Sequence, residues 1–424
     1  MSPQGDAENS VPMSKSMEPI GVYVHFPWCL KKCPYCDFVS FAAEPTSIEH
    51  DRYADAVIQE LQLRADALGQ HNLTTVFFGG GTPSLWAPRS LGRVLDAIKK
   101  AASSITDDLE ITVECNPSSL DEDKARALLD VGVNRLSVGV QGLDQERLGF
   151  LGRLHDARGG LDAVRAAVRA GVPRVSADLI YGVAVPAEGG STKYLAGRAT
   201  REQTSSEAAD EARRVAETGV THVSAYSLTI EPGTQFGELA RRGRLPLANE
   251  DAVADTFFAV EEALAEAGLR HYEISNYARE GHEARHNLGY WRGHDYLGLG
   301  TAAFGTIKKR GATTTQAFAT RYRNVPDPER YMQRVLAANL AVESEEDLDP
   351  ETRLRERIML GLRLAEGLDF EAACYELGIV STSNERQRSL TRLCEQGKIE
   401  REGGVIRVSR KAWVLADGIA AELF

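Results

Sequence analysis

Residues 22–38 read VYVHFPWCLKKCPYCDF, a β-rich run that leads directly into a loop with three cysteines. The Val, Tyr and Phe residues before the loop are typical of a buried strand. Cys29, Cys33 and Cys36 lie close together in a loop that also contains a proline. Three thiols in such a loop would pack poorly as core, so we interpret the loop as a binding site. The remaining cysteines stand alone and are typical of small buried residues: Cys115, Cys374 and Cys394.

The three clustered cysteines suit two kinds of metal centre. A structural zinc ion takes four ligands, usually from two Cys-x-x-Cys pairs, and the sequence has no second pair. A [4Fe–4S] cluster held by three thiolates keeps one iron open for another ligand. The cysteine set therefore favours an open iron–sulfur cluster over zinc.

From residue 20 onward, β-rich runs alternate with helical patterns. Stretches such as 51–68 and 161–172 repeat apolar residues every three or four positions, as amphipathic helices do. The β-rich runs between them are dense in Val, Ile, Phe, Tyr and Thr: 20–26, 74–78, 109–114, 135–141, 174–182 and 221–228. Six such repeats predict an α/β fold with a parallel sheet, either doubly wound or curled into a partial barrel.

The pattern changes after residue 235. Residues 250–269 predict a long amphipathic helix and residues 271–278 a strand, whereas residues 281–326 show little periodicity. From Pro326, helical patterns and a late hairpin around Gly403-Gly404 predict a winged-helix-like domain. We therefore divide the chain into a disordered tail (1–19), a barrel (20–235), a connecting region (236–326) and a smaller helical, winged-helix-like C-terminal domain (327–424).

Charge and hydropathy exclude several classes of protein. The chain has 61 acidic and 49 basic side chains, a net charge of −12, whereas nucleic-acid or anionic-membrane binders need clustered Lys and Arg. No apolar run is long enough for a transmembrane helix. The first nineteen residues lack the apolar segment of a secretory signal. We expect a cytoplasmic protein with no nucleic-acid partner.

Polar side chains recur where the predicted strands end. Glu114 ends the third strand, Gln141 ends the fourth, and Asp178 lies in the fifth. Arg153 follows the fourth strand, and each of these residues alone could be a hydrogen-bonded core residue. Residues 79–83, GGGTP, follow the second strand, and the lack of Cβ atoms in the three glycines would let the backbone approach a ligand. No Gly-Lys-Ser/Thr follows, which excludes a phosphate-binding loop. Because parallel barrels build their sites at these strand ends, we expect the polar residues to meet beside the cysteine loop.

Taken together, VYVHFPWCLKKCPYCDF, FFGGGTPS, VECNP, SVGVQ and DLIYG resemble, in content and order, one branch of the radical S-adenosylmethionine (SAM) superfamily. It is the coproporphyrinogen-III-oxidase-like branch, and the resemblance covers roughly residues 20–310. It implies a partial (β/α)6 barrel in which Cys29, Cys33 and Cys36 hold a [4Fe–4S] cluster whose open iron binds SAM. It also implies SAM contacts at Tyr23, Gly80, Gly81, Thr82, Glu114, Gln141, Arg153 and Asp178.

Two features separate the functions within this branch. Its oxygen-independent oxidases, which decarboxylate coproporphyrinogen III, have a further Cys where this chain has Phe38. The HemW family of haem chaperones lacks that Cys and has a His-Asn-x-x-Tyr-Trp motif, which stands here at residues 286–291. An exposed imidazole beside aromatic rings suits haem, so His286 is the candidate ligand, with His25 as the alternative. A structural His in an aromatic cluster is the other interpretation. The resemblance favours a haem chaperone, and the oxidase is the alternative.

The resemblance also implies partners. These are haem as cargo, an acceptor haemoprotein and, if SAM is cleaved, an electron donor such as flavodoxin or ferredoxin. One stretch departs from the family pattern, in which a short Pro-Gly turn follows DLIYG. Here residues 183–205 are longer and rich in Gly, Ala, Ser and Thr, which predicts a mobile surface loop near Asp178.

Overall fold

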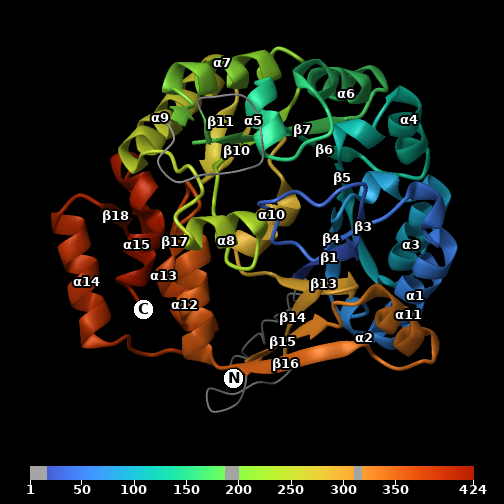
Figure 1. Cartoon of the computed structure of the whole chain (residues 1–424). Coiled ribbons are helices and arrows are strands. Elements are labelled where there is room, and N and C mark those ends of the chain that lie inside the picture. The colour runs from blue at the N-terminus through green and yellow to red at the C-terminus, as the bar shows by residue number, and fades with distance from the viewer. Residues whose placement is uncertain (1–16, 187–199, 310–317) are drawn as a thin grey trace, which may run out of the picture.

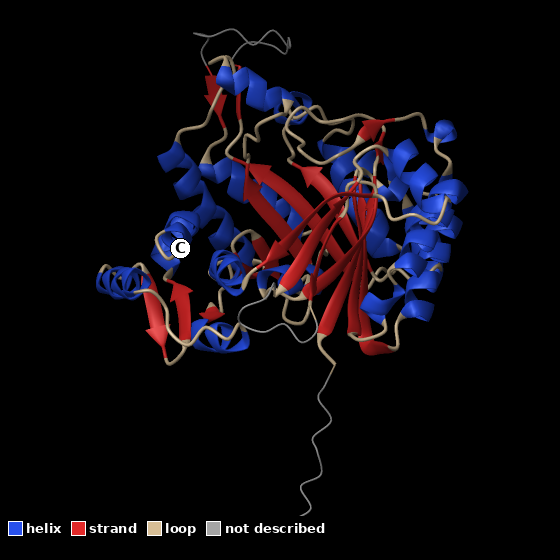
Figure 2. Ribbon diagram, turned by 90° about the horizontal axis from the view of Figure 1, so that it is seen from below, coloured by secondary structure: helices blue, strands red, loops and turns tan. Residues whose placement is uncertain are grey.

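A curved sheet forms the centre of the protein, with helices packed around it (Figure 2). The computed structural model describes residues 17–186, 200–309 and 318–424. The parallel strands of the sheet lie side by side in chain order. They are β1 (Pro19–Phe26), β4 (Asn72–Gly80), β5 (Ser104–Cys115), β6 (Arg135–Gln141), β7 (Arg174–Tyr181) and β10 (His222–Ser227). The predicted partial barrel is confirmed, and every predicted β-rich run up to residue 228 supplies one of its strands.

The helices that follow these strands cover the outer face of the sheet along an arc (Figure 1). They are α1 (His50–Leu63), α3 (Pro88–Ala101), α4 (Glu122–Asp130), α6 (Ala157–Arg169), α7 (Ser205–Ala216) and α9 (Glu250–Glu266). In α3, for example, Leu91, Val94 and Ile98 recur at helical spacing and are buried against the sheet. Side chains at the N-caps set where helices begin, as Asp156 does for α6 and Thr204 does for α7.

The sheet continues beyond the barrel at both edges. β13 (Asp295–Gly300) pairs parallel with β1, and the antiparallel strands β14 (Phe304–Lys308), β15 (Ala319–Asn324) and β16 (Val342–Leu348) follow it. At the other edge, the predicted single strand 271–278 is wrong. The segment forms β11 (Arg270–Glu273) and β12 (Asn276–Ala278), because the chain turns between them and the Glu273 carboxylate accepts a hydrogen bond from the Ser275 N–H at 3.3 Å.

Shorter elements connect these parts. They are β2 (Trp28–Cys29), β3 (Phe41–Ala42), α2 (Ala65–Leu68), α5 (Gln145–Phe150), α8 (Gln235–Arg241), α11 (Pro328–Leu336), η1 (Pro45–Ser47), η2 (Pro83–Leu85), η3 (Pro117–Ser119) and η4 (Arg410–Leu415). The ends of the predicted loop 183–205 pair as β8 (Ala184–Pro186) and β9 (Thr200–Glu202). Its residues 187–199 lie outside the described residues, as do residues 1–16 of the predicted N-terminal tail.

The C-terminal part of the chain has an apolar core of its own, formed by residues between Leu354 and Leu423. Its helices are α12 (Pro350–Gly361), α13 (Phe370–Glu376), α14 (Asn384–Glu395) and α15 (Ala416–Ala421). Its sheet consists of β17 (Leu368–Asp369), β18 (Ile399–Glu402) and β19 (Val405–Val408), and the β18–β19 hairpin turns at Gly403-Gly404. The predicted helical domain with a late hairpin is confirmed, but the predicted start at residue 327 is wrong, because residues 331–341 pack in the core of the barrel and β16 pairs with β15 of the central sheet. Within the described residues, every helix is too short or too polar to cross a bilayer.

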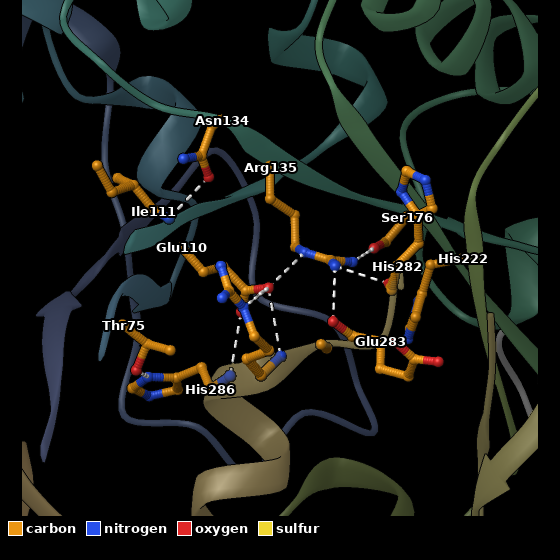
Figure 3. Close-up of polar contacts among 12 residues, drawn as sticks. Thr75, Glu110, Ile111, Asn134, Arg135, Ser176, His222, His282, Glu283 and His286 are labelled. Atoms are coloured by element: carbon orange, nitrogen blue, oxygen red, sulfur yellow. Dashed lines mark hydrogen bonds and ion pairs between the residues drawn. The ribbon is translucent and has the colours of Figure 1, made fainter. Parts of the chain in front are cut away.

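A buried ion pair closes the end of the barrel where the strands begin (Figure 3). Glu110 and Arg135 are at most 1% exposed, and the Arg135 Nε lies 3.1 Å from a Glu110 carboxylate oxygen. Arg135 also donates to the backbone oxygens of residues 282–283, at 2.7 and 2.9 Å. Glu110 accepts hydrogen bonds from the backbone N–H groups of residues 285–286, at 3.2 and 3.0 Å. The pair therefore holds α10 (Arg285–Trp291) by its N-terminus across this end of the barrel.

Replacing Arg135 with Met is expected to lower the free energy of unfolding by about 3–5 kcal/mol, because the buried Glu110 carboxylate then keeps only the longer ion pair with Arg285, at 3.9 Å. Urea denaturation followed by circular dichroism measures the change. Arg158→Met is the control: the Arg158 side chain is 89% exposed and pairs with Asp162 at the surface, so its loss should cost less than about 1 kcal/mol. Equal effects of the two substitutions would contradict the role of the Glu110–Arg135 pair.

Candidate functional site

The cysteine loop and the C-terminal ends of the barrel strands enclose a cavity of about 160 Å³. Its walls include Cys29, Cys33, Cys36, Gly80, Gly81, Thr82, Glu114, Gln141, Arg153 and Asp178. The structure thus brings together every residue for which the sequence predicted a cluster or SAM contact, with the exception of Tyr23.

The cysteine loop is held in place from several sides. β2, which ends at Cys29, pairs with β3 where the loop returns to the barrel. The backbone oxygen of Pro34 accepts a hydrogen bond from the Phe236 N–H of α8, at 2.9 Å. The Thr82 N–H donates to the backbone oxygen of Trp28 at 2.8 Å. Because these contacts come from distant parts of the chain, the whole barrel end positions the three thiols.

The arrangement of the thiols bears on the choice of metal. Among the described residues, no three His, Cys, Asp or Glu side chains converge as the ligands of one metal ion would. A tetrahedral zinc site requires such convergence. In a [4Fe–4S] cluster each thiolate binds a different iron, so the ligands stand apart around it. The three thiols line one cavity, which is the arrangement that the proposed cluster needs.

The glycines of residues 79–83 allow a close approach between two loops. The Gly81 N–H donates to the backbone oxygen of Phe26 at 2.7 Å, and a Cβ on Gly81 would lie 2.6 Å from the backbone oxygen of Trp28. Gly80 has φ +106°, a conformation that L side chains rarely adopt. We expected the missing Cβ atoms to make room for a ligand. In the structure, they make room for the backbone that leads into the cysteine loop.

Two carboxyl groups face the same cavity. Glu114 accepts a hydrogen bond from the Gly80 N–H at 3.1 Å, and Asp178 accepts one from the Ser137 hydroxyl at 3.1 Å. Burial and, to a smaller extent, the charge of Asp178 raise the pKa of Glu114 to about 8. Burial also raises the pKa of Asp178 to about 6, against serine hydrogen bonds and the charge of Arg153. Without a ligand, Glu114 is therefore mostly protonated at neutral pH.

Two polar atoms in the cavity wall lack a hydrogen-bond partner among the described residues. They are the Gln141 Oε1 and the Arg153 Nε. Arg153 is held by its other nitrogens, which lie 2.7 Å from the Gly139 oxygen and 3.6 Å from the Cys33 sulfur. Gln141 has φ +67°, an unusual backbone conformation for a residue other than glycine. Unpaired buried polar atoms are costly, and a ligand such as SAM, with carboxylate, amino and hydroxyl groups, would satisfy both of these.

Tyr23 lies deeper in the barrel than the cavity residues. Its hydroxyl hydrogen-bonds His25 Nδ1 at 3.0 Å, and its ring stacks on Phe77 with centroids 6.1 Å apart. The other ring nitrogen of His25 hydrogen-bonds the Val39 oxygen at 2.8 Å, and burial lowers the pKa of His25 to about 4. His25 therefore holds the segment that follows the cysteine loop, and Tyr23 holds His25.

Sequence reasoning missed several residues that line the cavity, among them Tyr35, Ser137 and Tyr226, and Cys115, set aside as an isolated buried residue, lines it as well. A signal for Ser137 was present, because alternate residues of a strand face the same side and Ser137 stands four positions before Gln141. Tyr226 lies on β10, where no polar residue had been singled out. For Tyr35, its place between two cysteines was the only indication.

His286 lies at the opposite end of the barrel, and the expectation of an exposed imidazole is wrong. The side chain is 3% exposed, and its Nδ1 and Nε2 hydrogen-bond the Thr75 and Tyr290 hydroxyls at 2.8 and 2.9 Å. Its ring stacks on Phe77 with centroids 4.9 Å apart, and burial lowers its pKa to about 3. Because both ring nitrogens have partners within the protein, the geometry agrees with the interpretation of a structural His in an aromatic cluster.

Comparisons with known proteins agree with the fold and the site. Residues 23–188 match the radical SAM superfamily, and residues 348–415 match the HemN C-terminal domain. The chain is 35% identical to the heme chaperone HemW of Haemophilus influenzae over 75% of this chain and 76% of that protein. It is 32% identical to HemW of Mycobacterium tuberculosis over 96% of this chain and 95% of that protein. The chain belongs to the HemW family of radical SAM proteins.

The similarity extends to a vertebrate protein and to a solved structure. The mitochondrial radical S-adenosyl methionine domain-containing protein 1 of Danio rerio is 32% identical over 82% of this chain and 73% of its own length. Coproporphyrinogen III oxidase (HemN) of Escherichia coli has a TM-score of 0.75 at 22% identity, over 96% of this chain and 90% of that chain. This likeness shows that the HemW-family chain shares the HemN fold. Membership of the radical SAM superfamily implies a [4Fe–4S] cluster and SAM as cofactors.

Replacing Glu114 with Gln is expected to stabilise the unliganded protein increasingly as the pH rises. Between the ordinary Glu pKa of 4.5 and about 8, the unfolded state ionises while the folded state keeps its proton, so wild-type stability falls with rising pH. The gain from Glu114→Gln should therefore grow by about 3–4 kcal/mol between about pH 5 and about pH 8. Melting temperatures at both pH values test this. Glu343→Gln, which changes an exposed residue on β16, is the control. A gain independent of pH would contradict the burial of an ionisable Glu114.

Proposed function

We propose that this protein binds haem as cargo and transfers it to an acceptor haemoprotein. The main support for the proposal is sequence similarity. Over most of its length, the chain is 32–35% identical to several proteins named heme chaperone HemW. Phe38 supports it, because this residue stands where the resembling oxidases have a further Cys. The Phe38 side chain is 54% exposed and lines the cavity beside the three cysteines.

We assign one [4Fe–4S] cluster to Cys29, Cys33 and Cys36. Their place in one cavity, at the end of the barrel where parallel folds build their sites, supports this assignment. With SAM, the cluster supplies reductive cleavage of a carbon–sulfur bond. The loop contacts from Pro34 and Trp28 hold the thiols in position for it.

The same cavity is the proposed SAM site. We assign the unpaired N–H of Arg153 to the methionine carboxylate, and Glu114 and Asp178 to the ribose hydroxyls; their place in one cavity supports this assignment. Gly80, Gly81 and Thr82 supply the wall beside the cysteine loop, and Tyr23 is the remaining proposed SAM contact, hydrogen-bonded to His25 within the barrel. If SAM is cleaved, a donor such as flavodoxin or ferredoxin supplies the electron. Lys31 and Lys32 are exposed on the cysteine loop and would face such an acidic partner.

A transfer assay tests the proposed function against the oxidase alternative. Anaerobically reconstituted protein, loaded with haem, is mixed with an apo-haemoprotein from the same organism, and the haem spectrum of the acceptor is followed. We expect haem to move to the acceptor. In a parallel reaction with coproporphyrinogen III, SAM and a reductant, we expect no protoporphyrinogen. Consumption of coproporphyrinogen III with cleavage of SAM, in the absence of haem transfer, would identify the protein as an oxidase instead.

A further inference from the structure

A second cavity, of about 490 Å³, lies between the barrel and the C-terminal domain. α10 and α12, which contact each other, form two of its walls, and the first residues of β1 and β13 form a third. Its volume falls in the range of about 300–1,000 Å³ that small-molecule sites have. Because Pro19 and Asp295 begin their strands, the cavity lies at the opposite end of the barrel from the cysteine loop.

One imidazole in the wall of this cavity is free to bind a ligand. The ring nitrogens of His294 make no hydrogen bond within the part of the chain that the structure describes. His25 and His286, the two candidates from the sequence, use both ring nitrogens for contacts inside the protein. Burial lowers the pKa of His294, and the charges of Arg292 and Arg357 lower it further. The ring is therefore neutral at physiological pH, the form in which imidazole binds a metal.

The end of α10 determines where His294 lies. The His294 N–H donates to the Gly289 oxygen and the Gly293 N–H donates to the Tyr290 oxygen, both at 2.9 Å. Gly293 has φ +68°, and together these features make a Schellman motif. This motif fixes the position of His294 relative to α10, the helix that contains Trp291. Within the His-Asn-x-x-Tyr-Trp motif, His286 anchors the helix in the barrel, while Trp291 faces the cavity.

The rest of the wall suits a flat apolar ring with carboxylate groups. Trp291, Phe318 and Leu368 offer apolar surface, and acidic side chains also line the cavity: Glu18, Glu366, Asp369 and Glu376. Arg353 and Arg357 lie one turn apart on α12. Each pairs with a glutamate through one terminal nitrogen, and each has a buried Nε–H without an acceptor in the described part of the chain. These N–H groups can donate to the carboxylates of a ligand.

We propose that this second cavity is the haem site, that His294 is the axial ligand of the haem iron, and that Arg353 and Arg357 bind the haem propionates. The inference rests on the proposed function, which makes haem the cargo. It assigns the haem to the end of the barrel away from the cluster and gives the His-Asn-x-x-Tyr-Trp helix a physical role.

Porphyrin titrations of the full-length protein test the site. Ferric haem is titrated into the wild type and His294→Ala, and free-base protoporphyrin IX, which has no iron, is titrated in parallel. We expect His294→Ala to shift the Soret band and weaken ferric haem binding by about tenfold or more, with little change for the free base. Added imidazole should restore the wild-type band. Arg357→Gln should weaken binding of both porphyrins by about threefold to tenfold, because both carry the propionates.

His282→Ala is the matched control, because its ring likewise has no hydrogen-bond partner among the described residues, but it does not line the cavity. It should change neither titration. If the wild type binds haem and both His294→Ala and Arg357→Gln bind it unchanged, the site is wrong while the proposed function stands. If the wild type binds no haem at all, the proposed function fails and the site fails with it.

Discussion

The parallel pairing of β1 with β13 sets the positions of both proposed sites. The register runs from Ile20 opposite Asp295 to His25 opposite Gly300. The cysteine loop follows the last residue of β1, and His294 immediately precedes the first residue of β13. Five residues of strand rise about 17 Å, so this strand pair separates the cluster site from the haem site by about the length of the barrel.

The interior of the barrel is filled along this length. Tyr23, Phe77 and His286 stack in sequence from the cluster end towards α10, and hydrogen bonds hold the outer two rings. At the far end, the buried Glu110–Arg135 pair fixes the segment that leads into α10. The consequence is a protein with two chemically different ends. In our account, the end beside the cysteines binds the cluster and SAM, and the end beside α12 carries the cargo.

Local patterns in the sequence predicted the barrel and the first cavity well. Strand order follows from repeated β–α units, and polar residues at strand ends such as Glu114 and Gln141 meet because parallel strands end at one edge. The environment of His286 could not be predicted in this way. Its hydrogen-bond partners Thr75 and Glu110 lie 211 and 176 residues away in sequence, and no short-range signal indicates that β13 pairs with β1. His294 was missed for the same reason, since its role depends on α12.

The independence of the two ends is the central claim, and the haem content of a protein without the cluster tests it most directly. Cys29, Cys33 and Cys36 are all replaced by Ser, and haem and non-haem iron are measured after loading with both. We expect the variant to lose its non-haem iron and to bind haem with the wild-type stoichiometry and Soret band. Loss of haem together with the cluster would contradict the account, because it would place the cargo at the cysteine end of the barrel.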